Sequence, residues 1–279
     1  MKTLLVPVDF SKFSEYALEA AANIAHKIGA RIVVSHMIGL NDAIFTKDGT
    51  QLSEETLYFI KLTEKRFDEF LNKDYLKGVD IVRNVQKFKF FNDLDPVIAQ
   101  FKVDLIVMGS HGSSGLSEMF VGSNTEKVVR SATVPVLVIK QPWKIKSIKK
   151  SVFACDFKKE SIPAYLTIKE WCNLIGTKLE LLYINLPDPN FRSTTEMEES
   201  VKKFFEAIPV TNPKKMAESI IYYNDYSVEE GIFSYANQNR IDLIAIPTHG
   251  RTGLAHFFSG SIGEDIANHS ELPVLTVKI

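Results

Sequence analysis

The sequence predicts an α/β fold with two similar doubly wound domains, each a five-stranded parallel sheet with helices on both faces. The chain has 279 residues, which is enough for two domains that each bury a core. The segments that start at Met108 and Ile246 are near copies of one another, and each follows a short apolar run. In both halves, apolar runs alternate with helical patterns, as expected for parallel strands joined by right-handed crossovers.

A second pair of similar segments extends this duplication to the start of each half. One segment begins at Val6 and the other at Phe153. The alignment pairs these residues: Asp9 with Asp156, and Gly29 with Gly176. The chain is therefore one unit written twice, and we place the two domains at residues 1–142 and 147–279.

The elements of the first half follow from their apolar patterns and end signals. Residues 4–9 form an apolar run typical of a buried parallel strand. A helix follows, with Ser11 or Ser14 as its cap and Gly29 where a left-handed stop is expected. The remaining elements are expected in this order: strand 31–38, helix 53–72, strand 79–86, a short helix opened by Pro96, strand 103–110, helix 123–132 and strand 134–140. The second half is expected to repeat the order.

The charged residues nearly balance, so nothing in the composition suggests nucleic acid or a membrane as a partner. Lysine and arginine total 33, aspartate and glutamate total 34, and the formal charge is −1. No apolar run approaches the roughly 18 residues that a membrane-spanning helix needs. Cys155 and Cys172 are the only cysteines, and the first residues lack the pattern of a signal peptide. We therefore expect a cytoplasmic protein whose two thiols lie in the core.

The duplicated loop of the first half has the residue types that hold phosphate. Gly109, Gly112, Gly122 and Ser123 give the spacing G-x-x-G-x9-G-S, and the last pair stands at the start of a predicted helix. Glycines let backbone amides approach an anion, and a helix N-terminus presents unpaired N–H groups to it. Asp9 ends the first strand, on the rim of the same crevice if the strand order reverses there. Its carboxylate can accept a hydrogen bond from a ribose hydroxyl or a base amine.

With these residues the chain resembles a tandem universal stress protein, a family whose nucleotide-binding members show G-x-x-G-x9-G-[S/T]. The resemblance covers nearly the whole chain. It implies a strand order of 3-2-1-4-5 in each domain and a site for ATP, AMP or ADP, with Mg²⁺ allowed at the phosphates. It assigns no catalytic residue and no protein metal ligand. The first site is carried over to these residues: Pro7, Val8, Asp9, Met37, Met108, Gly109, His111, Gly112, Gly122, Ser123, Asn124 and Thr125.

The second half departs from the family pattern at two positions. Pro247 replaces the first glycine, and Gly263 stands where the first half has Thr125. Proline removes a backbone donor, and each hydrogen bond lost to a charged ligand weakens binding by roughly tenfold to a hundredfold. We therefore predict a competent first site and a weaker second one. The weaker site comprises these residues: Asp156, Ile184, His249, Gly250, Gly260 and Ser261.

The predicted function is that of a stress-response protein in which adenine nucleotide acts as a regulatory signal. The chain lacks the catalytic patterns G-x-x-x-x-G-K-[ST] and G-x-S-x-G, so we expect a weak ATPase at most. Two alternatives stay open. One is an adenylyl-transferring enzyme, and the other is an interaction scaffold whose C-terminal half binds an apolar ligand.

The last strand of each half is expected to be an edge strand, whose unpaired backbone groups favour pairing. These strands are residues 134–140 and 272–279. We predict that they pair with each other, so that the halves form a pseudo-twofold dimer within one chain. Whole chains can also form a homodimer, and protein partners are left open.

Overall fold

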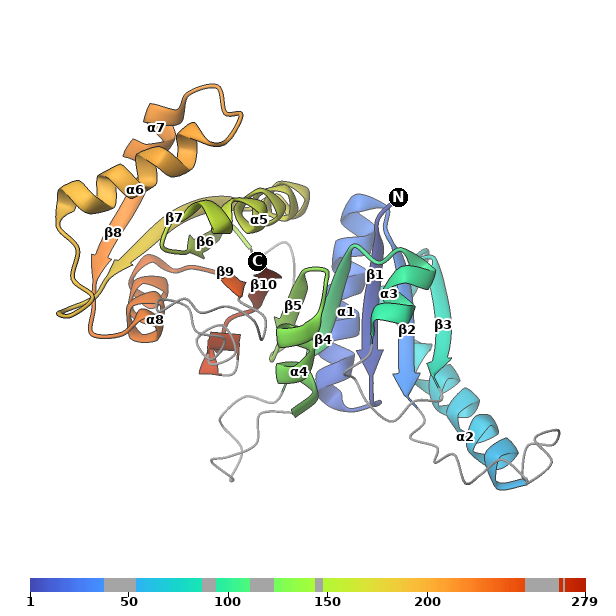
Figure 1. Ribbon diagram of the computed structural model, residues 1–279. Helices are drawn as coiled ribbons and strands as arrows, with labels where there is room; N and C mark the ends of the chain where they lie inside the picture. Colours follow the sequence, from blue (N-terminus) through green and yellow to red (C-terminus); the bar gives the residue numbers. More distant parts are fainter. Residues whose placement is uncertain (38–53, 87–93, 111–122, 144–147, 249–265, 268) are drawn as a thin grey trace.

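The computed structural model describes residues 1–37, 54–86, 94–110, 123–143, 148–248, 266–267 and 269–279. The first half alternates strands and helices as expected (Figure 1). Its elements are β1 (Thr3–Val8), α1 (Lys12–Ile28), β2 (Arg31–Met37), α2 (Glu54–Leu71), the 3-10 turn η2 (Asp74–Leu76), β3 (Ile81–Gln86), α3 (Asp95–Phe101), β4 (Leu105–Gly109), α4 (Ser123–Ser131) and β5 (Val136–Ile139).

The described elements of the second half follow this order with two differences, and most of the segment that corresponds to α4 lies outside the described residues. A 3-10 turn precedes its first long helix, and a further short helix follows the next one. Its described elements are β6 (Lys150–Ala154), η4 (Lys159–Ser161), α5 (Ile162–Ile175), β7 (Lys178–Asn185), α6 (Thr194–Glu206), α7 (Pro213–Glu218), β8 (Ile220–Asn224), α8 (Val228–Asn239), β9 (Leu243–Thr248) and β10 (Val274–Lys278). Helix α7, which starts at a proline capped by Asn212, was not expected from the repeat.

The described strands form one continuous sheet in the order β3-β2-β1-β4-β5-β10-β9-β6-β7-β8. Each half therefore has the expected order 3-2-1-4-5, and neighbouring strands within each half are parallel. The two halves meet where β5 pairs antiparallel with β10, with Leu137 opposite Leu275. The prediction that the two end strands pair within the chain is confirmed.

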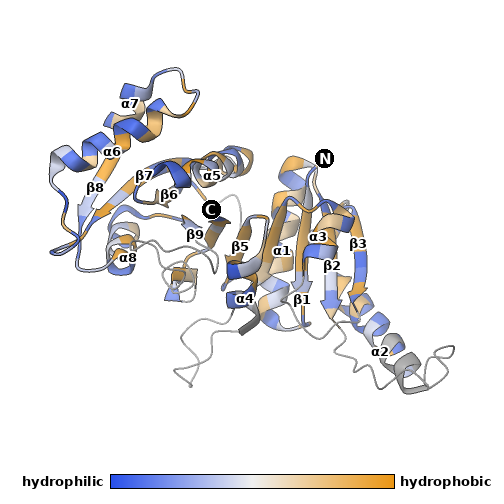
Figure 2. Ribbon diagram, in the orientation of Figure 1, coloured by the Kyte–Doolittle hydropathy of each residue, from blue (hydrophilic) through white to orange (hydrophobic). Residues whose placement is uncertain are grey.

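Two hydrophobic cores lie on opposite faces of this sheet, and each continues from one half into the other. Side chains alternate along a strand, so Leu4 and Val6 belong to one core and Leu5 to the other. Helices α1, α2, α5 and α6 cover the first face, and α3, α4 and α8 cover the second. Figure 2 shows apolar colour along the strands and polar colour on the outer sides of the helices. The halves are thus joined by shared cores as well as by backbone pairing.

Helix α1 shows why the sequence signals at its ends were informative. The Ser11 side chain accepts a hydrogen bond from the Ser14 amide, which satisfies one donor of the first turn. Gly29 ends the helix at φ 66°, and Gly176 ends α5 in the same way at φ 71°. The inner side of α1 is rich in buried alanine, which favours helix and lets the helix pack closely on the sheet.

Polar contacts from α1 and from Lys2, which precedes β1, to α5 of the second half add to the junction. The Lys27 ammonium donates to the carbonyl oxygen of Ile175, one of the last carbonyls of α5. The Lys2 ammonium lies 3.0 Å from the Glu170 carboxylate and 5.7 Å from the centre of the Trp171 ring.

No helix among the described residues has the length and apolar character needed to cross a membrane.

Candidate functional site

The first candidate site lies where the strand order reverses. Strand β1 pairs with β2 on one side and with β4 on the other, so the carboxyl ends of β1 and β4 border a switch point. Ligands of open α/β sheets bind in the crevice outside such ends. Asp9 directly follows β1, and Gly109 is the last residue of β4.

Asp9 has an exposed side chain at the rim of this crevice. Its Oδ1 atom accepts a hydrogen bond of 2.9 Å from the Ser11 amide. Partial burial favours the protonated carboxyl, but hydrogen bonds from Ser11 and Ser14 outweigh this and lower the pKa of Asp9 below its ordinary value. Among the described residues, none forms an ion pair with Asp9. The ionised acid therefore keeps acceptor capacity toward the crevice.

The matching acid of the second half has a different environment. Asp156 Oδ2 lies 2.8 Å from the Lys158 ammonium, and its carboxylate is only 11% exposed. Lys158 stands where the first half has Ser11, and its amide also donates to Asp156 Oδ1 at 3.3 Å. The Asp156 carboxylate is thus already paired with a cation from its own turn.

Gly109 is required by packing in addition to any role toward a ligand. A Cβ atom at this position would lie 2.2 Å from the Phe13 carbonyl oxygen in the first turn of α1, a contact that cannot be tolerated. In the second half, Pro247 takes this place within β9, and the chain forms the turn η4 before α5 begins at Ile162. The later helix start is consistent with the greater bulk of proline.

The start of α4 is tied to the end of β4. The Thr125 side chain is buried, and its hydroxyl donates to the Gly109 carbonyl at 3.2 Å. The Ser110 amide donates to the Ile139 carbonyl at 3.0 Å. Two donors near the predicted phosphate loop therefore serve the protein itself, and the helix start is held close to the strand end.

The remaining predicted residues divide between the sheet and the segments outside the described residues. Pro7 and Val8 are buried in β1, Met108 is buried in β4, and Met37 is partly buried at the end of β2. Ser123 and Asn124 begin α4. In the second half, Ile184 is buried near the end of β7. The following residues lie outside the described part: His111, Gly112, Gly122, His249, Gly250, Gly260 and Ser261.

Sequence reasoning missed the aromatic cluster around Phe10, the residue after Asp9. The His36 ring lies 4.5 Å from the Phe10 ring. Its Nδ1–H donates to the Val8 carbonyl at 2.7 Å, and burial is the main cause that lowers the pKa of His36. Phe67 and Phe70 of α2 complete the cluster. Because α2 is distant in sequence, no local signal could have revealed it.

Both cysteines are core residues, as expected. Cys155 is fully surrounded by protein, and burial raises the pKa of its thiol well above the ordinary value. Burial also raises the pKa of Cys172 to about 12. Thiolates are the reactive form, so neither residue has the character of a redox sensor. Within the described part, no three His, Cys, Asp or Glu side chains converge as metal ligands would.

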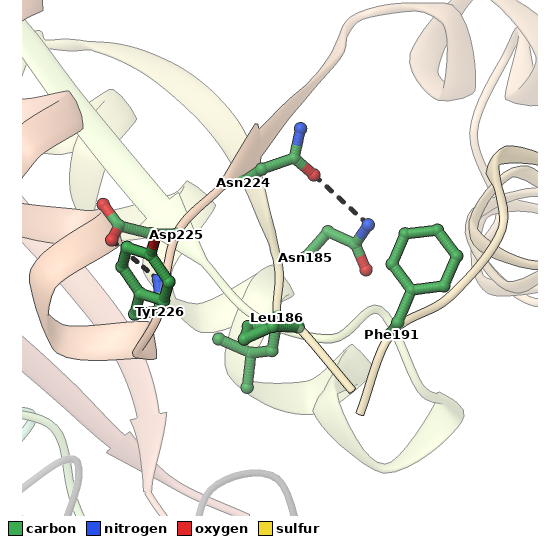
Figure 3. Close-up of a pocket in the computed structure, with 7 residues that line it drawn as sticks. Asn185, Leu186, Phe191, Asn224, Asp225 and Tyr226 are labelled. Carbon is green, nitrogen blue, oxygen red and sulfur yellow. Dashed lines mark hydrogen bonds between the residues drawn. The ribbon is translucent and has the colours of Figure 1, made fainter. Parts of the chain in front are cut away.

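A cavity of about 390 Å³ opens at the carboxyl ends of β7 and β8, a second feature that sequence reasoning missed (Figure 3). Its labelled lining residues are Asn185, Leu186, Phe191, Asn224, Asp225 and Tyr226. The Asn185 side chain is 5% exposed and links two sides of the cavity. It exchanges hydrogen bonds with the backbone of Arg192, and it donates to Asn224 Oδ1 at 3.2 Å. Phe191 and Tyr226 are 63% and 86% exposed. The cavity therefore offers aromatic surface beside amide and carboxylate groups.

The fold and the crevice define a class of protein: a tandem pair of doubly wound α/β domains with an acid at each switch point. The chain belongs to the universal stress protein family, whose model matches residues 1–140 and 152–278. It is 24% identical to the universal stress protein Slr1230 of Synechocystis sp., over the full length of both chains. It is 31% identical to the universal stress protein YxiE of Bacillus subtilis over 152 residues, which cover 49% of this chain and 97% of that one.

Solved structures show the same architecture over the whole chain. A universal stress protein from Archaeoglobus fulgidus is 21% identical, with a TM-score of 0.68, and the match covers 99% of this chain and 98% of that one. A second from Pseudomonas aeruginosa is 15% identical, with a TM-score of 0.62 and coverage of 100% and 93%. At these identities the likeness shows the fold, and the ligand must be argued from the crevice itself.

Proposed function

We propose that the first half binds an adenine nucleotide in the crevice between β1 and β4. Asp9 accepts a hydrogen bond from the ribose or the base, and the loop that joins β4 to α4 receives the phosphates. The observation that carries this proposal is the exposed, hydrogen-bonded Asp9 carboxylate at the switch point, with acceptor capacity left for a ligand. The glycine spacing of the loop supports the phosphate end.

The second half is proposed as the weaker partner. The ion pair between Asp156 and Lys158 competes with any ligand hydroxyl, and Pro247 offers no backbone donor. The two proposed functional units are residues 1–142 and residues 147–279. Nucleotide occupancy of the first crevice then acts as the regulatory signal, and no dedicated catalytic step is part of the proposal. The proposed location is the cytoplasm. Mg²⁺, where present, arrives with the phosphates.

Isothermal titration calorimetry of the full chain tests the proposal. ATP, ADP and AMP are titrated with and without Mg²⁺, and the expected stoichiometry is close to one nucleotide per chain. Asp9→Asn is expected to weaken binding by roughly tenfold or more, through loss of a charged acceptor. Asp156→Asn is the matched control and leaves the affinity unchanged. Two equal sites, or equal losses in both variants, would contradict the asymmetric assignment.

The cavity at β7 and β8 favours a second function for the C-terminal half. Its mixed lining suits a small organic molecule with a flat ring and N–H or O–H donors, and the apolar ligand considered from the sequence stays an alternative. Ligand-observed NMR with a fragment library tests this function. Compounds that bind through the cavity lose their signal in Phe191→Ala, whereas Phe13→Ala in the first half leaves it intact. Equal signals in the two variants exclude the cavity as the binding site.

A further inference from the structure

The residue after each crevice acid has a backbone conformation that side chains rarely adopt. Phe10 follows Asp9 with φ 64°, and Phe157 follows Asp156 with φ 50°. Within the described residues, the other non-glycine residues with positive φ are Lys102 and Arg240, which cap the ends of α3 and α8. A left-handed residue at a helix end is ordinary, whereas a bulky residue in that conformation between a strand and a helix is strained.

Aromatic packing holds the strained residue in both halves. The Phe10 ring lies 4.5 Å from His36 and makes edge-to-face contacts with Phe67 at 5.2 Å and Phe70 at 5.4 Å. Glycine would adopt the same backbone without strain, so the sequence uses a ring where backbone freedom alone would favour glycine.

The second half repeats this arrangement with different partners. The Phe157 ring stacks on Tyr183 at 6.2 Å and meets Phe204 edge-to-face at 5.3 Å. An anchored ring beside a crevice acid thus occurs twice in one chain, on two separately built aromatic clusters.

The left-handed turn fixes the carboxylate that precedes it. It brings the amide of the residue two positions after the acid to the carboxylate, at 2.9 Å for Ser11 on Asp9 and 3.3 Å for Lys158 on Asp156. We infer that Phe10 is a positioning residue for the ligand site: its anchored ring maintains the turn that aims the Asp9 carboxylate at the crevice. This inference rests on the proposed function for its ligand site, whereas the effect of Phe10 on the turn is measured without nucleotide.

The first test measures the turn without any nucleotide. The pKa of Asp9 is followed in the full chain by NMR titration of its carboxyl carbon. In Phe10→Ala the hydrogen bond from Ser11 weakens, and the pKa of Asp9 rises toward its ordinary value. Phe10→Tyr keeps the ring and restores the wild-type value, and Phe157→Ala, the matched control, leaves Asp9 unchanged. If Phe10→Ala does not fold, Phe10→Leu keeps apolar volume without the ring and gives the same readout.

The second test asks whether Phe10 acts through Asp9. Phe10→Ala is expected to weaken ATP binding about tenfold, and the double variant with Asp9→Asn binds no more weakly than Asp9→Asn alone. Losses that multiply in the double variant, or an unchanged pKa of Asp9 in folded Phe10→Ala, overturn the inference. If the wild-type chain binds no nucleotide, the proposed function fails, and the NMR titration still decides the role of Phe10.

Discussion

The Lys158 ammonium lies 2.8 Å from the Asp156 carboxylate, whereas the equivalent neighbour of Asp9 is the uncharged Ser11. Both acids follow the first strand of their half, and both are held by a similar turn. One side chain therefore distinguishes an available acceptor from an occupied one. This difference makes the asymmetry between the halves directly testable.

Placing a lysine beside Asp9 is expected to reproduce the second half in the first. Ser11→Lys creates an ion pair that competes with the ligand, and ATP affinity falls about tenfold by calorimetry. Ser11→Ala removes the same helix cap and adds no cation, so it costs about 1 kcal/mol of unfolding free energy with a smaller effect on affinity. Equal affinities for the two variants would show that the cation is not what closes the second site.

Gly109→Ala is expected to destabilise the chain strongly. Its Cβ atom would lie 2.2 Å from the Phe13 carbonyl oxygen, and backbone on both sides must move. We expect a loss of about 3 kcal/mol in the free energy of urea unfolding. Gly231→Ala is the comparison variant, because its Cβ atom meets side-chain atoms and no backbone, with Ile184 Cγ2 at 2.9 Å and Asp225 Cβ at 3.1 Å, and alanine favours the helix, so a smaller loss is expected. A similar loss in the comparison variant would remove the argument for close backbone approach.

The junction between the halves is expected to respond to paired substitutions. Leu137 and Leu275 face one another across β5 and β10, and both are almost fully buried. Each leucine-to-alanine change costs about 3 kcal/mol, and the double variant loses less than the sum by about 0.5–1 kcal/mol. Chemical denaturation of the four proteins measures this coupling. Strict additivity would mean that the two side chains do not interact across the junction.

The free energy of unfolding is expected to rise at alkaline pH because of Lys140, which is buried just after the end of β5. Burial lowers its pKa to about 8 in the folded chain, against an ordinary value of 10.5. The unfolded chain then holds the proton more tightly, so the cost of burying the charge is fully present below pH 8 and is relieved as the pH rises toward 10.5. We expect a gain of about 3 kcal/mol at most across this window.

Substitution isolates the effect of Lys140 from other groups that titrate in the same range. Lys140→Met removes the titration, and its stability curve is flatter than that of the wild type between pH 8 and 10.5. Lys149→Met, at an exposed lysine, serves as the control and keeps the wild-type slope. Parallel curves for the wild type and Lys140→Met would refute the assignment.

The sequence predicted those features that local chemistry or the repeat determines. Ser11 and Gly29 mark the ends of α1 through hydrogen bonding and backbone freedom, and the duplicated end strands correctly indicated that β5 and β10 pair. The ion pair of Asp156 could not be inferred from a lysine two residues away, because the rotamer of that lysine depends on the surrounding fold.

Features built from distant segments were out of reach. The left-handed Phe10 depends on rings from α2, and the cavity depends on residues of two strands that are adjacent only in the folded sheet. The packing requirement at Gly109 likewise comes from α1. Such contacts leave no periodic or spacing signal in a single sequence.

Because β5 and β10 run in opposite directions, the strands of one half end at the edge of the sheet where those of the other half begin. The carboxyl ends of β1 and β4 beside Asp9 and those of β7 and β8 at the cavity consequently lie at opposite strand ends of the sheet. A molecule bound at one of these places would lie at the opposite strand ends from a molecule bound at the other. The two places are connected through the strands of the shared sheet and through α1 and α5, which contact one another across the junction of the halves.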